Sequence, residues 1–210
     1  METAFHTLAH TIGLELPERF LALIAQAHSD SGAMRRVYDL FWLDADAAER
    51  EMEEWLNPDD QQGRLFLPFA TNGSGESYCF VQLESGVRGI AQALHYGQMT
   101  RLAYTDISAW IASRYISLAA DLSHLPLQTA VGATITQEVN SLDQALLPTD
   151  LALLVDLFSR PCSSMPFKDG PNSLPRTVGA FISQQEERSL LNSLEQPDAI
   201  EFAVLREWMR

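Results

Sequence analysis

The sequence has almost no lysine. Lys168 is the only one in 210 residues, and lysine and arginine together number 14 against 28 aspartates and glutamates, so the formal net charge is −14. Phosphate-binding surfaces need concentrated lysine and arginine, which argues against a nucleic-acid ligand and against an anionic membrane surface. A basic protein partner would instead be attracted and steered. Acidity also serves solubility, and composition alone does not separate these two explanations.

The chain also lacks paired cysteines, long apolar runs and a signal peptide. Cys79 and Cys162 lie far apart and neither belongs to a Cys-x-x-Cys pair, so two free buried thiols are expected rather than a disulfide. No stretch approaches the roughly 18 uninterrupted apolar residues that indicate a transmembrane helix. The first residues show neither a basic start nor an apolar run. We therefore expect a cytoplasmic protein that does not insert into a membrane.

What the sequence does contain is enough apolar material for a core, 46% of its residues. Helical periodicity predicts helices at residues 18–28, 44–55, 105–122 and 149–158, and two more within 181–210 that are separated at Pro197. Runs of aromatic and aliphatic residues predict strands at residues 36–43, 65–70, 77–83 and 89–96. Thr105 or Asp106 is the expected cap of the third helix. Residues 129–147 show no clear period, and the proline-rich residues 160–175 indicate a loop.

These elements predict an α+β fold, with a mixed or antiparallel sheet that is flanked by helices. Residues 1–124 account for one α+β domain. Residues 125–210 are predicted to form a mostly helical C-terminal extension or a small second domain.

A glycine-rich turn separates two of the predicted strands and indicates a hairpin with a loop longer than two residues. Gly73 and Gly75 are expected to supply positive φ angles, while Asn72 and Ser74 close the loop with side-chain hydrogen bonds. We interpret Asn72, Gly73, Gly75 and Glu76 as a fold signature, because these requirements are structural.

Three segments, in this order, resemble the SUKH superfamily, which is named for a yeast cell-wall-synthesis regulator and its bacterial relatives. Residues 16–20 (LPERF) are similar to the start of its first helix, residues 67–80 to its central strand–turn–strand signature, and residues 103–111 to the start of its final helix. The resemblance covers about residues 14–120. Glu76 stands where the superfamily usually has an aspartate in the turn.

The resemblance implies a binding role without catalysis. Bacterial members resemble immunity proteins that neutralise toxins, often nucleases, of polymorphic or contact-dependent systems, and eukaryotic members resemble regulatory scaffolds. We therefore expect an immunity protein that binds a cognate toxin domain of basic character. The alternative is a non-enzymatic scaffold or regulatory domain whose partner site lies in residues 125–210. A homodimer stays open in both cases.

The segment from Asp39 to Asp60 is the candidate binding surface. It holds nine acids and one base, Arg50, and like charges such as Glu49 and Glu53 repel each other on a helix by roughly a few tenths of a kcal/mol. A solvated helix face would explain this pattern, and so would a docking surface for a basic protein. The residues predicted to contact the partner are Asp44, Asp46, Glu49, Glu51, Glu53, Glu54, Asp59 and Asp60.

Reactive groups are few. His6 and His10 are spaced to share a helical face, but a zinc site needs at least a third ligand. Ser74 does not belong to a nucleophile elbow, and no glycine-rich phosphate loop is present. We expect no catalytic residue, metal or cofactor. The remaining histidines are solitary: His28, His95 and His124.

Overall fold

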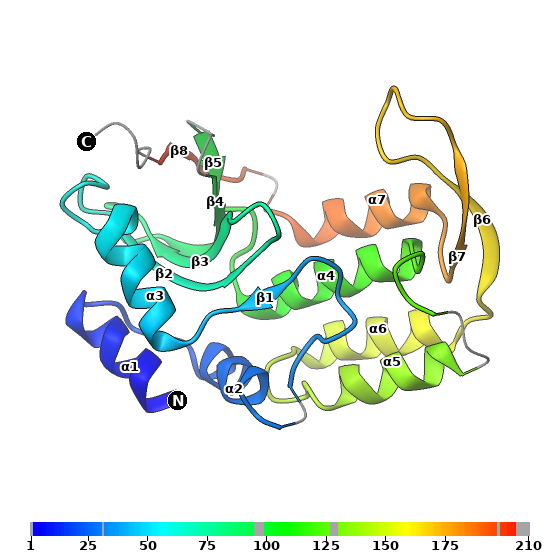
Figure 1. Ribbon diagram of the computed structural model, residues 1–210, viewed down its shortest axis with the longest axis horizontal. Coiled ribbons are helices and arrows are strands. Elements are labelled where there is room, and N and C mark those ends of the chain that lie inside the picture. Colours follow the sequence, from blue (N-terminus) through cyan, green and yellow to red (C-terminus); the bar gives the residue numbers. More distant parts are fainter. Residues whose placement is uncertain (1, 31, 95–98, 127–129, 197, 205–210) are drawn as a thin grey trace.

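The computed structural model describes residues 2–30, 32–94, 99–126, 130–196 and 198–204 (Figure 1). Its helices are α1 (Glu2–Thr11), α2 (Glu18–Ala27), α3 (Ala45–Glu51), α4 (Ile107–Ala120), α5 (Val131–Asn140), α6 (Pro148–Ser159) and α7 (Gln184–Leu194), and a π-helical segment, η1 (Met52–Leu56), follows α3 directly. Its strands are β1 (Phe41–Trp42), β2 (Leu65–Thr71), β3 (Ser77–Gln82), β4 (Arg88–Ala93), β5 (Met99–Arg101), β6 (Ser163–Phe167), β7 (Arg176–Ala180) and β8 (Glu201–Ala203). The predicted α+β class is confirmed.

The main sheet has the order β1-β2-β3-β4, and every pairing in it is antiparallel. Both of its faces are buried. Leu67 and Phe69 of β2 belong to the larger apolar cluster, whereas Phe66 packs on the other face with Trp55 of η1 and Phe202 of β8. A strand that is buried on both sides carries a nearly continuous apolar run, as residues 65–70 do. Two small antiparallel ribbons, β5-β8 and β6-β7, complete the strands.

Helix α4 lies at the centre of the molecule, between α7 on one side and α6 and α5 on the other (Figure 1). The carboxylate of Asp106 caps it by accepting a hydrogen bond from the backbone N–H of Ala109 at 3.1 Å, as predicted. Twelve of its 14 residues are buried. Trp110 packs edge-on against Phe69 of the sheet, and Tyr115 packs against Phe158 of α6. One apolar cluster therefore includes residues from both sides of position 124, while the predicted division into domains stays a prediction.

The predicted strand at residues 36–43 is wrong for most of its length, because only Phe41 and Trp42 are extended and paired. Asp39 has φ 57°, a left-handed conformation that interrupts a strand. Its carboxylate accepts a hydrogen bond from the backbone N–H of Gly73 at 2.7 Å. In this left-handed conformation, Asp39 therefore links the segment before β1 to the β2–β3 turn.

Three expectations for the C-terminal part are also wrong. Helix α5 occupies residues that show no clear period, since only Ile135 and Val139 of this helix are buried. The predicted loop at 160–175 contains β6, whose Pro166 is tolerated because β6 belongs to a two-stranded ribbon. Where the final helix was predicted, residues 201–203 instead form β8, which pairs with β5. Pro197 and residues 205–210 lie outside the described residues.

Among the described helices, none combines the length and the apolarity that crossing a membrane requires. Both cysteines are free, as predicted, but only Cys79 is buried; Cys162 is exposed in the segment before β6. Burial, with a smaller contribution from the charge of Glu51, holds the pKa of the Cys79 thiol well above its usual range. The two thiols should therefore differ strongly in reactivity.

In the native protein, we expect 5,5′-dithiobis(2-nitrobenzoate) to modify Cys162 rapidly and Cys79 only after unfolding. The measurement is the absorbance of the released thiolate, first without denaturant and then in guanidinium chloride. A Cys162→Ser variant is the control and should show no rapid phase. Equal rates for both thiols in the native protein would contradict the burial of Cys79.

Candidate functional site

The acidic segment is built on α3 and η1. The carboxylate of Asp44 caps α3 by accepting from the backbone N–H of Ala47 at 2.7 Å. One side of the helix is anchored in the core by Ala48, Met52, Trp55 and Leu56. Helical spacing then directs the acids at positions 46, 49 and 53 to the opposite side, where they form one stripe.

Six of the eight predicted contact residues are exposed, and we call this set the acidic face: Asp44, Asp46, Glu49, Glu53, Glu54 and Asp59. The other two are half-buried and bonded within the molecule. The Glu51 carboxylate accepts hydrogen bonds from the Trp55 indole N–H at 2.8 Å and from the Ser77 hydroxyl at 3.1 Å. Asp60 accepts one from the side-chain amide of Asn57 at 2.7 Å. These two carboxylates therefore contribute to the fold through hydrogen bonds within the molecule, and their predicted contact with a partner stays a prediction.

No residue of the acidic face makes an ion pair with another residue in the described part of the chain. Arginines elsewhere are paired with other acids: Arg36, Arg64, Arg88, Arg101, Arg160 and Arg176. The molecule therefore neutralises several of its charges internally, but it leaves this surface uncompensated.

The fold-signature turn is organised by Asn72. Its side-chain oxygen accepts from the backbone N–H groups of Ser74 and Glu76, each at 3.0 Å, and its side-chain amide donates to the Glu76 carboxylate at 2.8 Å. The predicted loop closure by Asn72 is confirmed, whereas Ser74 contributes its backbone and not its hydroxyl. Glu76 also accepts from the Gln92 amide of β4 at 2.8 Å, so its role in the turn is structural.

The two glycines of the turn are required for different reasons. Gly75 has φ +80°, as expected, but Gly73 does not have a positive φ, which corrects the prediction. A Cβ at Gly73 would lie 2.6 Å from a carboxylate oxygen of Asp39. Gly73 is therefore needed for close approach and not for its backbone angles.

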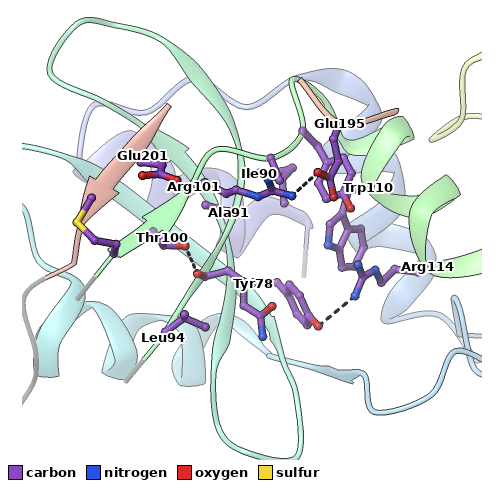
Figure 2. A pocket seen from close by; sticks show the side chains of 14 residues that line it. Tyr78, Ile90, Ala91, Leu94, Thr100, Arg101, Trp110, Arg114, Glu195 and Glu201 are labelled. Atoms are coloured by element: carbon purple, nitrogen blue, oxygen red, sulfur yellow. Dashed lines mark hydrogen bonds and ion pairs between the residues drawn. The ribbon is translucent and has the colours of Figure 1, made fainter. Parts of the chain in front are cut away.

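A cavity of about 350 Å³ that the sequence did not indicate lies between β4, the β5-β8 ribbon and α4 (Figure 2). Trp110 of α4 contributes to its wall. This residue is 1% exposed, and its indole N–H has no hydrogen-bond acceptor. Leaving a buried donor unsatisfied costs about 1–3 kcal/mol, so such a group calls for an explanation.

Arg114 lies one helical turn after Trp110 and lines the same cavity. Its guanidinium donates to the Tyr78 hydroxyl at 3.4 Å and lies 5.7 Å from the centre of that ring. Among the described residues, no carboxylate is within ion-pair distance of it. Burial raises the pKa of Tyr78, against the opposing effect of the Arg114 charge, so the hydroxyl stays protonated at neutral pH. Arg114 is thus a half-buried cation without an anion, in a strongly acidic protein.

The rest of the cavity wall includes apolar side chains and polar side chains that already have hydrogen-bond or ion-pair partners. Ile90, Leu94 and Met99 provide apolar surface. Arg101 is paired with Glu195, and the Thr100 hydroxyl donates to the backbone carbonyl of Gln92. Figure 2 shows the Arg101–Glu195 pair on one side of Trp110 and the Arg114–Tyr78 pair on the other. The spacing of positions 110 and 114 indicates a shared helix face, but only the fold reveals which donors lack a partner.

The histidines do not assemble into a site. His6 and His10 are both exposed on α1, His28 is half-buried with a pKa that burial lowers, and the His124 ring bonds to the backbone carbonyl of Arg36 at 2.9 Å. His95 lies outside the described residues. Within the described ranges, no three or more His, Cys, Asp or Glu side chains are placed to hold a metal ion.

No family model, curated protein or solved structure matches this chain. The resemblance to the SUKH superfamily therefore stays a prediction from sequence. The function must be argued from the surfaces described above.

Proposed function

We propose that this protein is a binding module without catalytic activity, and that its acidic face docks on a positively charged protein. The resemblance to SUKH immunity proteins adds the class of partner, a basic toxin domain that acts in the same cytoplasmic compartment. The proposal rests on one observation: six exposed carboxylates on α3, η1 and the residues that flank them have no ion-pair partner in the described structure.

This arrangement suits binding better than stability. Repulsion between like charges such as Glu49 and Glu53 along a helix is slightly destabilising, so helix stability does not explain these two carboxylates. Asp46 differs, because an acid in the first turn of α3 interacts favourably with the helix dipole. The opposite side of α3 and η1 is buried through Ala48, Met52 and Trp55, and this packing fixes the position of the segment that carries the carboxylates. Complementary charges speed up association, and close charge pairs across an interface contribute about 1.5–7 kcal/mol of coupling.

Exposed aromatic side chains precede the acidic face in the chain. Phe41 of β1 is 58% exposed and Tyr38 is 71% exposed. β1 is an edge strand of the main sheet, and it leads into α3 within a few residues. Interfaces draw most of their affinity from a few aromatic anchors that charged residues surround. Phe41 is the exposed aromatic residue closest in sequence to the acidic face, and we assign it this anchoring role.

Charge reversal should slow association. For a D46K/E49K/E53K variant, we expect the association rate with the basic protein encoded beside this chain in its genome to fall about tenfold or more at low salt, because electrostatic steering contributes about 10–10³-fold. Surface plasmon resonance measures this rate at several ionic strengths. A D30K/D143K/D198K variant is the matched control, since it changes the net charge equally at exposed positions elsewhere.

The control should keep most of the wild-type rate. A companion assay asks whether co-expression of this chain restores growth to cells that produce the same basic protein. The proposal fails if both triple variants associate at the same rate, or if added salt does not slow the wild-type protein.

A further inference from the structure

The cavity in Figure 2 places two hydrogen-bond donors without adequate acceptors on one wall. The Trp110 indole N–H is buried and unpartnered, and the Arg114 guanidinium has only long hydrogen bonds to two neutral hydroxyls, those of Tyr78 at 3.4 Å and Ser113 at 3.3 Å. The ring centres of Tyr78 and Trp110 are 5.5 Å apart, so the three side chains form one cluster. A group that fits this cluster must accept hydrogen bonds and carry negative charge.

A carboxylate meets both conditions. Its two oxygens match the planar fork of a guanidinium and can also accept from a neighbouring N–H. A neutral acceptor would satisfy the indole but would leave Arg114 without a counter-charge. The side chains that line the cavity do not supply this anion, because Glu195 is paired with Arg101 and Figure 2 shows Glu201 at the opposite end from Arg114.

The remaining walls limit the size and charge of the ligand. Ile90, Leu94 and Met99 offer an apolar surface to the body of a ligand, and the volume of about 350 Å³ lies at the lower end of the range for small-molecule sites. Glu201 would repel a second negative charge at the far end of the cavity. These features favour a monoanion with a body of about one aromatic ring.

We propose that this cavity binds a small organic monocarboxylate, whose carboxylate is held by Arg114 and the Trp110 indole N–H and whose apolar body lies against Ile90, Leu94 and Met99. This site is separate from the acidic face and does not depend on the proposed protein partner. In the bound state, the Trp110 indole N–H and the Arg114 guanidinium would both have an anionic acceptor.

The test uses the full chain and isothermal titration calorimetry with three carboxylates as probes: hexanoate, phenylacetate and 3-phenylpropionate. Phenylacetamide is the neutral control, with nearly the same shape as phenylacetate. We expect at least one carboxylate to bind to the wild-type protein, and the amide to bind at least about tenfold more weakly, because charge-assisted hydrogen bonds are roughly twice as strong as neutral ones.

Two variants separate ligand binding from folding. Arg114→Gln removes the charge and should weaken carboxylate binding about tenfold or more, since hydrogen bonds to charged groups are the strong ones. Trp110→Phe keeps one aromatic ring but removes the N–H and makes the side chain smaller at a buried position, so the melting temperature without ligand should fall. At temperatures where this variant is folded, its carboxylate affinity should be about fivefold lower than that of the wild-type protein. Arg19→Gln, at an exposed position outside the cavity, should change neither quantity.

Three results would overturn the proposal. One is that none of the carboxylates binds to the wild-type protein at millimolar concentration, and another is that the amide binds as tightly as phenylacetate. The third is that folded Trp110→Phe binds carboxylates as tightly as the wild-type protein, because the indole N–H would then not hold the ligand.

Discussion

A chain truncated after residue 124 is expected not to fold. Helix α4 would lose α6 and α7, which pack against it from two sides, and with them α5, which packs against α6. Tyr115, Ile116 and Leu118 of α4 are each at most 3% exposed in the full chain. Burying a large apolar side chain contributes about 1.5–3 kcal/mol, so exposing several of them would remove most of a typical stability of 5–15 kcal/mol.

Polar links across the same boundary would be lost as well. The Ser108 hydroxyl of α4 donates to the Asp150 carboxylate of α6 and accepts from the backbone N–H of Leu147 at 2.7 Å. The backbone N–H of Phe181 donates to the carbonyl of Ala119 at 2.7 Å. Without residues 125–210, these groups lose their intramolecular partners and bond to water instead. The truncation would therefore remove specific polar links as well as expose apolar surface.

Circular dichroism during heating and size-exclusion chromatography measure the effect of the truncation. We expect residues 1–124 to show no cooperative transition and to aggregate, and we expect co-expression with residues 125–210 to restore a soluble, cooperatively unfolding complex. The full-length chain is the reference. A cooperative thermal transition for residues 1–124 alone would show that α4 does not need its C-terminal neighbours, and it would favour two separate domains.

Local patterns predicted the elements whose stability is local. The strands 65–70 and 77–83 and the cap at Asp106 follow from short runs of sequence, and the structure has them in place. Strands β6 and β8 were not predicted, because each is stabilised by pairing with a separate segment of the chain, β7 or β5, and not by its own local sequence. For β8, the partner lies in a different third of the chain.

The candidate site residues also differ in whether local sequence or contacts between distant segments determine their surroundings. Asp46, Glu49 and Glu53 are exposed, which agrees with their helical spacing relative to the buried Ala48 and Met52. Glu51 differs, because one of its hydrogen-bond donors is Ser77, which only the fold brings close. Trp110 is buried, as its position in an apolar stretch of α4 indicates. That its N–H lacks an acceptor depends on side chains from β3, β4 and β5, and no pattern in α4 could indicate it.

Replacement of Glu138 by alanine should be the most destabilising single substitution proposed here, at about 3 kcal/mol. The side chain of Glu138 is 8% exposed and forms an ion pair with Arg36, and it also accepts from the Tyr115 hydroxyl at 2.7 Å. Removing one partner of a buried pair costs about 3–5 kcal/mol. We expect the lower end, because the Arg36 side chain is 35% exposed and can reach water, whereas Tyr115 is fully buried.

Guanidinium unfolding followed by circular dichroism measures this change, and a melting temperature about 6–12 °C lower would accompany it in a chain of this size. Glu15→Ala is the matched control, because Glu15 is 86% exposed in its pair with Arg88 and a surface pair contributes at most about 1 kcal/mol. In a Tyr115→Phe background, the cost of Glu138→Ala should shrink, since no hydroxyl is then left unpartnered. Equal costs in both backgrounds would contradict the network.

Loss of Glu138 should lower stability without slowing the association that we propose for the acidic face. Arg36 lies in the segment before β1, so the ion pair with Glu138 ties that segment to α5. The acidic face is anchored separately, through Ala48, Met52 and Trp55. At temperatures where Glu138→Ala remains folded, its association rate with the basic protein should therefore match that of the wild-type chain. A slower rate would show that the segment before β1 also belongs to the docking surface.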